Sequence, residues 1–357
     1  MKCNDQQGFT LVEMMVSFAL SAILITGLIQ IFNSNKQASG MQTGIARIQE
    51  SGRISMEMLA RDLRNASFMG CSTGEFGDNF TNHVDASKYA SGEVQQALSI
   101  FDGDNAIVGY DNVTVIASGS VLDGFGLTVG TSEGDVLSGS DIIVLQNAAP
   151  CDGGKVVDGG TGTAQIKIQD ASACGIGQND IVIVSNCTTA EAFGVTNNPA
   201  SGGSKDTLAH GSNLNISNKL LGTYDDDSFI YKPKSSLYYV GIGESGEPAL
   251  FLKSLTNVTS ANAYTSYELA DAVENLQILY GEDTDDDQSA NRYVPAGTVG
   301  LDMNQVVSVR TGVLVRSNDN ITSTNQSYSY NGANVVAADK RVRVSYETTT
   351  TIRNRVN

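Results

Sequence analysis

One carboxylate stands inside the most apolar segment of the chain. Glu13 lies near the start of an apolar run that extends from Phe9 to Phe32, directly after Gly8. As a helix, the 24 residues of this run would be about 36 Å long, which exceeds the ~30 Å of bilayer hydrocarbon. A charged side chain deep in a membrane costs roughly 2.5–3.5 kcal/mol. Glu13 therefore points to an interaction that offsets this cost.

The residues before the apolar run have the wrong order for an ordinary secretory signal. The polar leader ends in Gly8 before the apolar core begins, and no Ala-x-Ala-like site follows near Phe32. An uncleaved signal anchor is the alternative that this pattern leaves open.

The string Gly8-Phe9-Thr10-Leu11-Val12-Glu13 resembles the processing motif of type IV pilins and type II secretion pseudopilins. The resemblance implies that a prepilin peptidase cleaves after Gly8, that Phe9 becomes the methylated N-terminus and that Glu13 neutralises the terminal amine of a neighbouring subunit. The physical argument agrees, because an opposite charge within ~4–6 Å makes a buried carboxylate tolerable. A filament of stacked helices supplies that charge, whereas a lone anchor does not.

A helical pattern continues beyond Phe32 although the sequence becomes polar. Apolar residues recur at spacings of three, four or eight, with Gly52 in the gap, at Met41, Ile45, Ile48, Met56, Leu59 and Leu63. No proline precedes Pro150, so one helix of about 55 residues is predicted, ending between Asn65 and Gly70. A separate anchor and a separate soluble helix are the alternative.

The expected organisation has four parts and an α+β fold. Residues 1–8 form the leader, 9–32 the transmembrane and assembly half of the helix, and 33–70 its amphipathic continuation. Residues 71–357 form a β-rich domain, predicted to be mainly antiparallel, with long insertions at 72–136 and 188–227. Alternating or apolar runs predict strands at 141–145, 165–168, 180–184, 237–240, 250–252, 306–315 and 341–346. Residues 267–281 fit a helix or a strand, and a strand beginning near Val273 is favoured because pilin-like proteins carry a sheet there.

Further segments resemble the PilW family of minor pilins. They lie at residues 46–53, 59–64, 68–71, 186–193, 246–250, 273–281 and 349–355. The resemblance implies a structural protein that helps to initiate or cap a type IV pilus, with other minor pilins, pilin subunits, the prepilin peptidase and the inner membrane as partners. It also implies one membrane pass, a periplasmic C-terminal domain and incorporation into a pilus that serves twitching motility, adhesion or DNA uptake.

Three other functions are weighed against this one. A large pseudopilin of type II secretion (J-like) would share the same features, and a membrane-anchored surface adhesin would need no processing. An enzyme is not expected, because the sequence has no Gly-x-Ser-x-Gly element, no phosphate loop and no credible histidine partner for a nucleophile.

The charge of the chain is strongly acidic. The net charge of −17 argues against a general nucleic-acid-binding face, which would be basic. Basic residues nevertheless cluster near the C-terminus at Lys340, Arg341, Arg343, Arg353 and Arg355. They indicate either a solvated final hairpin or a contact for an acidic neighbouring subunit.

Four cysteines remain once the leader with Cys3 is removed. Cys71, Cys151, Cys174 and Cys187 form an even set, which in an exported domain predicts disulfides. Four cysteines allow three pairings, and their spacing does not choose among them. A zinc site is not expected, because no Cys-x-x-Cys pair occurs and the chain has only two histidines.

An acidic loop after Tyr280 is a candidate Ca²⁺ site. Asp283, Asp285 and Asp287 alternate and Asn291 follows, which places oxygen ligands as in the first half of an EF-hand loop. Gln288 replaces the required glycine and Val294 the bidentate glutamate. A solvated acidic turn between strands is the alternative.

Overall fold

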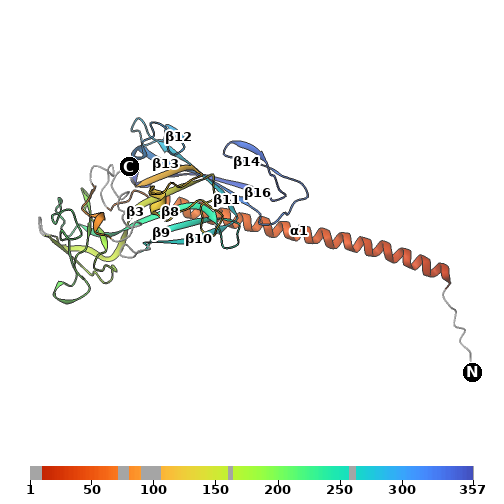
Figure 1. The fold of residues 1–357 in the computed structure, drawn as a ribbon, viewed down its shortest axis with the longest axis horizontal. Coiled ribbons are helices and arrows are strands. Elements are labelled where there is room, and N and C mark those ends of the chain that lie inside the picture. Colours follow the sequence, from red (N-terminus) through yellow and green to blue (C-terminus); the bar gives the residue numbers. More distant parts are fainter. Residues whose placement is uncertain (1–9, 71–79, 90–105, 160–163, 257–262, 357) are drawn as a thin grey trace, which may run out of the picture.

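The computed structural model describes residues 10–70, 80–89, 106–159, 164–256 and 263–356. A long N-terminal helix, α1, projects from a β-rich domain, and its apolar half extends far beyond that domain (Figure 1). The α+β class and the mainly antiparallel sheet predicted from the sequence are confirmed.

The helix α1 spans Leu11–Asn65, and its 55 residues confirm the single continuous helix. It ends where Ala66 turns to an extended conformation and Ser67 adopts a positive φ of 65°. The amphipathic stripe is buried from Ile48 onward, whereas Met41 and Ile45 remain 38% and 37% exposed. The β domain therefore covers only the last five turns or so of the helix.

Within the described residues the larger sheet has ten strands, and its two longest strands are neighbours. β3 (Ser140–Asp158) and β8 (Phe229–Ile242) pair antiparallel along most of their length. The first part of β3 also pairs with β2 (Ile107–Val113), and the last part with β4 (Gln165–Ile168). The start of β8 pairs with β5 (Ile181–Ser185) and its end with β9 (Pro248–Leu255). The sheet is completed by β10 beside β9, β7 beside β4, and β6 and β1 beyond β5, at Tyr264–Asp271, Thr207–Ala209, Ala190–Gly194 and Phe80–Asn82.

The second sheet lies against the buried half of α1. Its order is β12 (Arg292–Val294), β11 (Val273–Glu282), β13 (Val306–Arg316) and β16 (Arg343–Thr351), all antiparallel. β11 confirms the strand expected from Val273. A separate hairpin joins β14 (Ser327–Tyr330) to β15 (Ala333–Val336). Short helical turns complete the described elements at α3 (Val121–Gly124), η1 (Ala86–Lys88), η3 (Gly202–Ser204), η4 (Met303–Gln305) and η5 (Arg353–Arg355).

Three groups of buried side chains form the core. One joins α1 to both sheets through Ile48, Leu59 and Leu63, and a second fills the middle of the larger sheet around Phe125 and Tyr239. The third lies at the end farthest from the N-terminus, around Val182 and Phe193. The segments expected as insertions contribute to this architecture, because β1 and β2 fall within 72–136 and β6 and β7 within 188–227.

Candidate assembly site

The first turn of α1 holds the carboxylate of Glu13 in a capping box. Thr10, the N-cap residue, accepts the backbone N–H of Glu13 through its hydroxyl at 3.3 Å. Glu13 Oε2 in turn accepts the backbone N–H and the hydroxyl of Thr10, both at 2.9 Å. This arrangement satisfies donors that a helix start otherwise leaves unpaired. The carboxylate is thus held at the helix start, beside the predicted new N-terminus; Gly8 and Phe9 themselves lie outside the described residues.

The apolar half of α1 is exposed among the residues that the structure describes. Its large apolar side chains, from Leu11 to Phe32, are between 53% and 76% exposed on all sides of the helix. By length and composition this segment is able to cross a membrane. An apolar surface of this extent indicates burial in lipid, against other helices, or both.

Two contacts fix the other half of α1 on the β domain. Asp62, which is 5% exposed, accepts the hydroxyl of Tyr238 at 2.8 Å and pairs with Lys234 at 3.3 Å. At Gly52, the helix approaches Tyr346 so closely that an added Cβ would lie 2.3 Å from its ring. Sequence reasoning placed Gly52 on the apolar stripe but missed its role, and it missed Asp62, whose position between Leu59 and Leu63 was the available signal.

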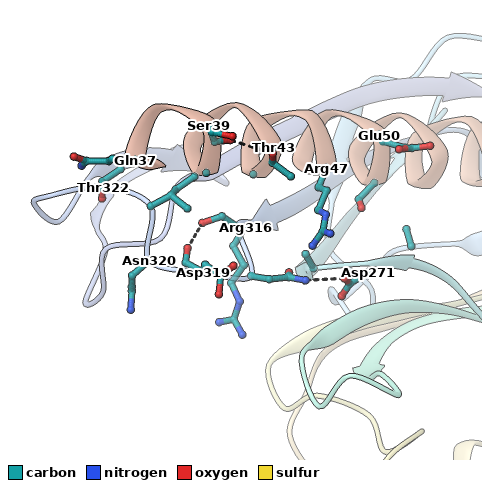
Figure 2. A pocket seen from close by; sticks show the side chains of 18 of the residues that line it. Gln37, Ser39, Thr43, Arg47, Glu50, Asp271, Arg316, Asp319, Asn320 and Thr322 are labelled. Atoms are coloured by element: carbon teal, nitrogen blue, oxygen red, sulfur yellow. Dashed lines mark hydrogen bonds between the residues drawn. The ribbon is translucent and has the colours of Figure 1, made fainter. Parts of the chain in front are cut away.

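A groove of about 860 Å³ lies between the middle of α1 and the β domain (Figure 2). The helix contributes one wall from Asn33 to Ile54, including Arg47, which points into the groove. The end of β10 and residues 316–322 form the opposite wall, where Asn318 donates to Asp271 at 2.8 Å. Ile321 reaches the helix at Gly44, where an added Cβ would lie 2.8 Å from its side chain. The groove thus begins one residue after the apolar half of the helix ends.

Comparison with known protein families finds one match in the N-terminal part of the chain and one in its C-terminal third. Residues 3–29 match the prokaryotic N-terminal methylation motif, and residues 237–354 match the family of type IV pilus-assembly protein W, PilW. The chain thus combines a pilin-type methylation motif at its N-terminus with a C-terminal third that is similar to PilW.

The type IV-like pilin TTHA1219 from Thermus thermophilus is a structural match to this chain, at 13% sequence identity and a TM-score of 0.24. The match covers 51% of this chain and 87% of the other. No curated protein matches the sequence. Proteins of the PilW family are structural pilins that interact with other pilus components.

The structure pairs two of the four predicted disulfide cysteines with each other. Cys151, on β3, forms a disulfide with Cys174, in the turn that precedes β5. Cys187, in the turn between β5 and β6, is also disulfide-bonded. Cys71 lies outside the described residues. The established bond removes two of the three possible pairings.

The acidic loop lies between β11 and β12. Asp283, Asp285 and Asp287 each bring a carboxylate oxygen within 4.8 Å of the others. Hydrogen bonds within the loop also occupy these groups: Asp283 accepts three backbone N–H groups, and the Asn291 amide binds Asp285 and Thr284. The three carboxylates are therefore close enough to share a cation, but they also make hydrogen bonds within the loop itself. Ca²⁺ binding stays a prediction.

The basic cluster near the C-terminus is mostly engaged within the chain. Arg341 makes a bidentate pair with Glu247, and Arg343 pairs with Glu274 and Asp339. Arg355 donates to Ser67 and to the carbonyls of Met303 and Val306, and burial lowers its pKa to about 10. Both interpretations of this cluster, a solvated hairpin and a contact for an acidic neighbour, are wrong for these three arginines. They join the chain end to α1 and the two sheets.

Proposed function

We propose that this chain is a minor pilin that helps to initiate or cap a type IV pilus after cleavage between Gly8 and Phe9. In this proposal residues 9–32 first anchor the chain in the inner membrane, with the β domain in the periplasm. Prepilin peptidase cuts after Gly8, the amine of Phe9 is methylated, and the chain then enters the pilus.

The observation that carries the proposal is a carboxylate at the start of an apolar helix half that is exposed among the described residues. Glu13 lies within the segment that matches the methylation motif, and its resemblance to the pilin glutamate supports a role as partner for a neighbouring amine. The capping box with Thr10 keeps the carboxylate satisfied while the chain is alone. In the assembled state an amine within ~4–6 Å supplies an opposite charge, so that each Glu13 selects one stagger between neighbouring helices.

The groove beside α1 supports a second contact with a neighbouring pilin. It continues the exposed helix surface beyond Phe32 and presents both Arg47 and the acidic residues Asp271 and Asp319. Mixed charge of this kind favours a specific partner rather than general adhesion. The match to the PilW family over residues 237–354 favours the pilus over a type II secretion pseudopilin or a lone adhesin.

The proposal is tested on the mature protein and on piliation together. Mass spectrometry of the N-terminus should show methylated Phe9, and Gly8→Ala should retain residues 1–8 and abolish surface pili. Glu13→Gln should be processed but fail to assemble. Glu57→Gln is the matched control, because Glu57 is an exposed carboxylate on the same helix outside the apolar half. A mature chain that keeps its leader, or normal piliation with both Gly8→Ala and Glu13→Gln, would refute the proposal.

A further inference from the structure

A buried ionisable cluster lies at the end of the β domain farthest from the N-terminus of α1. His83 follows β1, Glu191 is on β6, and His210 follows β7. These side chains are 6%, 1% and 0% exposed. Charged groups are rarely buried to this extent unless they are paired.

Glu191 binds four donors and thereby fixes one end of residues 211–224. Its carboxylate contacts Nε2 of His83 and accepts the hydroxyl of Tyr224 at 2.8 Å. It also accepts the backbone N–H groups of Leu221, at 2.9 Å, and Gly222, at 2.6 Å. A carboxylate with this many charge-assisted hydrogen bonds is a strong anchor.

The same segment is fixed a second time through the backbone of His83. The carbonyl of His83 accepts the N–H of Ile216 at 2.7 Å, and its own N–H donates to the carbonyl of Ala192 at 2.9 Å. The two residues anchored in this way present large apolar side chains to solvent, Ile216 at 74% exposed and Leu221 at 76%. The buried cluster thus determines how this apolar pair is displayed.

His210 is the group in this cluster whose protonation would destabilise the closed arrangement. Among the described residues neither ring nitrogen has a hydrogen-bond partner of regular geometry, and the ring packs on Phe193 with the centroids 5.0 Å apart. A neutral imidazole tolerates this environment, but an imidazolium there loses its solvent, and the backbone of His210 and Asn218 offsets that loss only in part. Of the ionisable groups around it, His83 opposes a positive charge on His210, whereas Glu191 favours one.

We propose that this cluster is an acid-sensitive latch: His210 is neutral when residues 211–224 are closed, and its protonation opens them and changes the display of Ile216 and Leu221. The latch is independent of the assembly role of Glu13. A domain outside the cytoplasm, as proposed above, experiences the pH of its surroundings.

The pH window follows from proton linkage. Burial, followed by the nearby His83, lowers the pKa of His210 from 6.5 to about 4 in the closed state. The open state therefore binds the proton more tightly, and stability of the closed state is lost as the pH falls. The opening constant should rise up to tenfold per pH unit between about 6.5 and about 4. Burial alone would raise the pKa of Glu191, but its hydrogen bonds from His83, Leu221, Gly222 and Tyr224 hold it below 4.5. Glu191 therefore does not supply the response above pH 4.5, and the His210→Phe variant separates His210 from His83.

The test is hydrogen exchange on the full chain in detergent micelles, corrected for the intrinsic pH dependence of exchange. The amides of Leu221 and Gly222 should exchange up to tenfold faster per pH unit from 6.5 to 4.5. In His210→Phe, which keeps an aromatic ring beside Phe193 but cannot be protonated, the corrected rates should be flat. Amides of β13 are the internal control and should not respond in either protein.

Two outcomes would overturn the latch. The first is a flat profile in the wild-type chain, and the second is the same pH response in His210→Phe. A response that persists in His210→Phe but disappears in His83→Gln would show that His83 controls the opening, which contradicts the proposal. If His210→Phe does not fold, imidazole titration by NMR decides, since the chain has only two histidines: a His210 that titrates near 6.5 contradicts the proposal.

Discussion

Replacement of Gly52 by alanine tests how α1 is seated on the β domain. An added Cβ would lie 2.3, 2.6 and 2.7 Å from three ring carbons of Tyr346, where real Cβ contacts do not occur. The ring must therefore move, and its hydroxyl would leave the carbonyl of Ile48. Overpacking of this kind costs about 1–3 kcal/mol, whereas alanine in a helix gains up to ~1 kcal/mol over glycine.

The expected net effect is a loss of about 1–2 kcal/mol in the free energy of unfolding. For a domain of this size the Tm should fall by roughly 2–6 °C. The measurement is thermal unfolding of the full chain in micelles, followed by near-ultraviolet circular dichroism. Gly40→Ala is the matched control, because nothing lies within 4 Å of its added Cβ, and its Tm should be unchanged or higher.

A double-mutant cycle decides whether Tyr346 is the cause. In a Tyr346→Ala background the space beside Gly52 is open, so Gly52→Ala should be neutral or stabilising there. The steric argument fails if Gly52→Ala is as stable as the wild type, or if its penalty is the same with and without the tyrosine ring.

Three further predictions concern single features of the β domain. Cys187 should be linked to Cys71 in the mature protein. Gly70, the residue before Cys71, lies so close to Ser185, two residues before Cys187, that an added Cβ would be 2.5 Å from Ser185 Oγ. Peptide mapping without reduction checks this bond, and a free Cys71 thiol would contradict it. Calorimetry should detect Ca²⁺ binding at millimolar concentration that Asp285→Ala abolishes, and the absence of any heat would leave the loop as a plain turn. Asp62→Ala should cost about 2 kcal/mol by leaving Tyr238 and Lys234 without their acceptor, whereas Asp62→Asn, which still accepts from Tyr238, should cost less in the same unfolding assay.

Features with a regular period could be predicted from the sequence. The stripe from Ile48 to Leu63 predicted the buried face of α1, and the short runs around Ile142, Ile183 and Val307 predicted strands β3, β5 and β13. These predictions succeeded because burial on one face imposes a period of 3.6 or 2 on the side chains.

Features that depend on which elements meet could not be read in this way. Arg341 and Glu247 are 94 residues apart, so only the tertiary fold shows that their charges cancel. The extension of β3 to Asp158 was hidden because Gly153 and Gly154 interrupt its apolar pattern. His83 and His210 are isolated in the sequence, and their shared environment arises from strands that lie far apart in the chain.

The long pairing of β3 with β8, whose register shifts between Pro150 and Lys155, has a mechanical consequence. β8 begins beside β5 at the end of the domain far from α1, and it carries Lys234 and Tyr238, which bind Asp62 on the helix. A hinge between the two ends of the domain would have to break the ladder that joins these two strands. The strand pair should therefore resist bending, and a force applied to the end of the domain near β5 would be transmitted along β3 and β8 to α1.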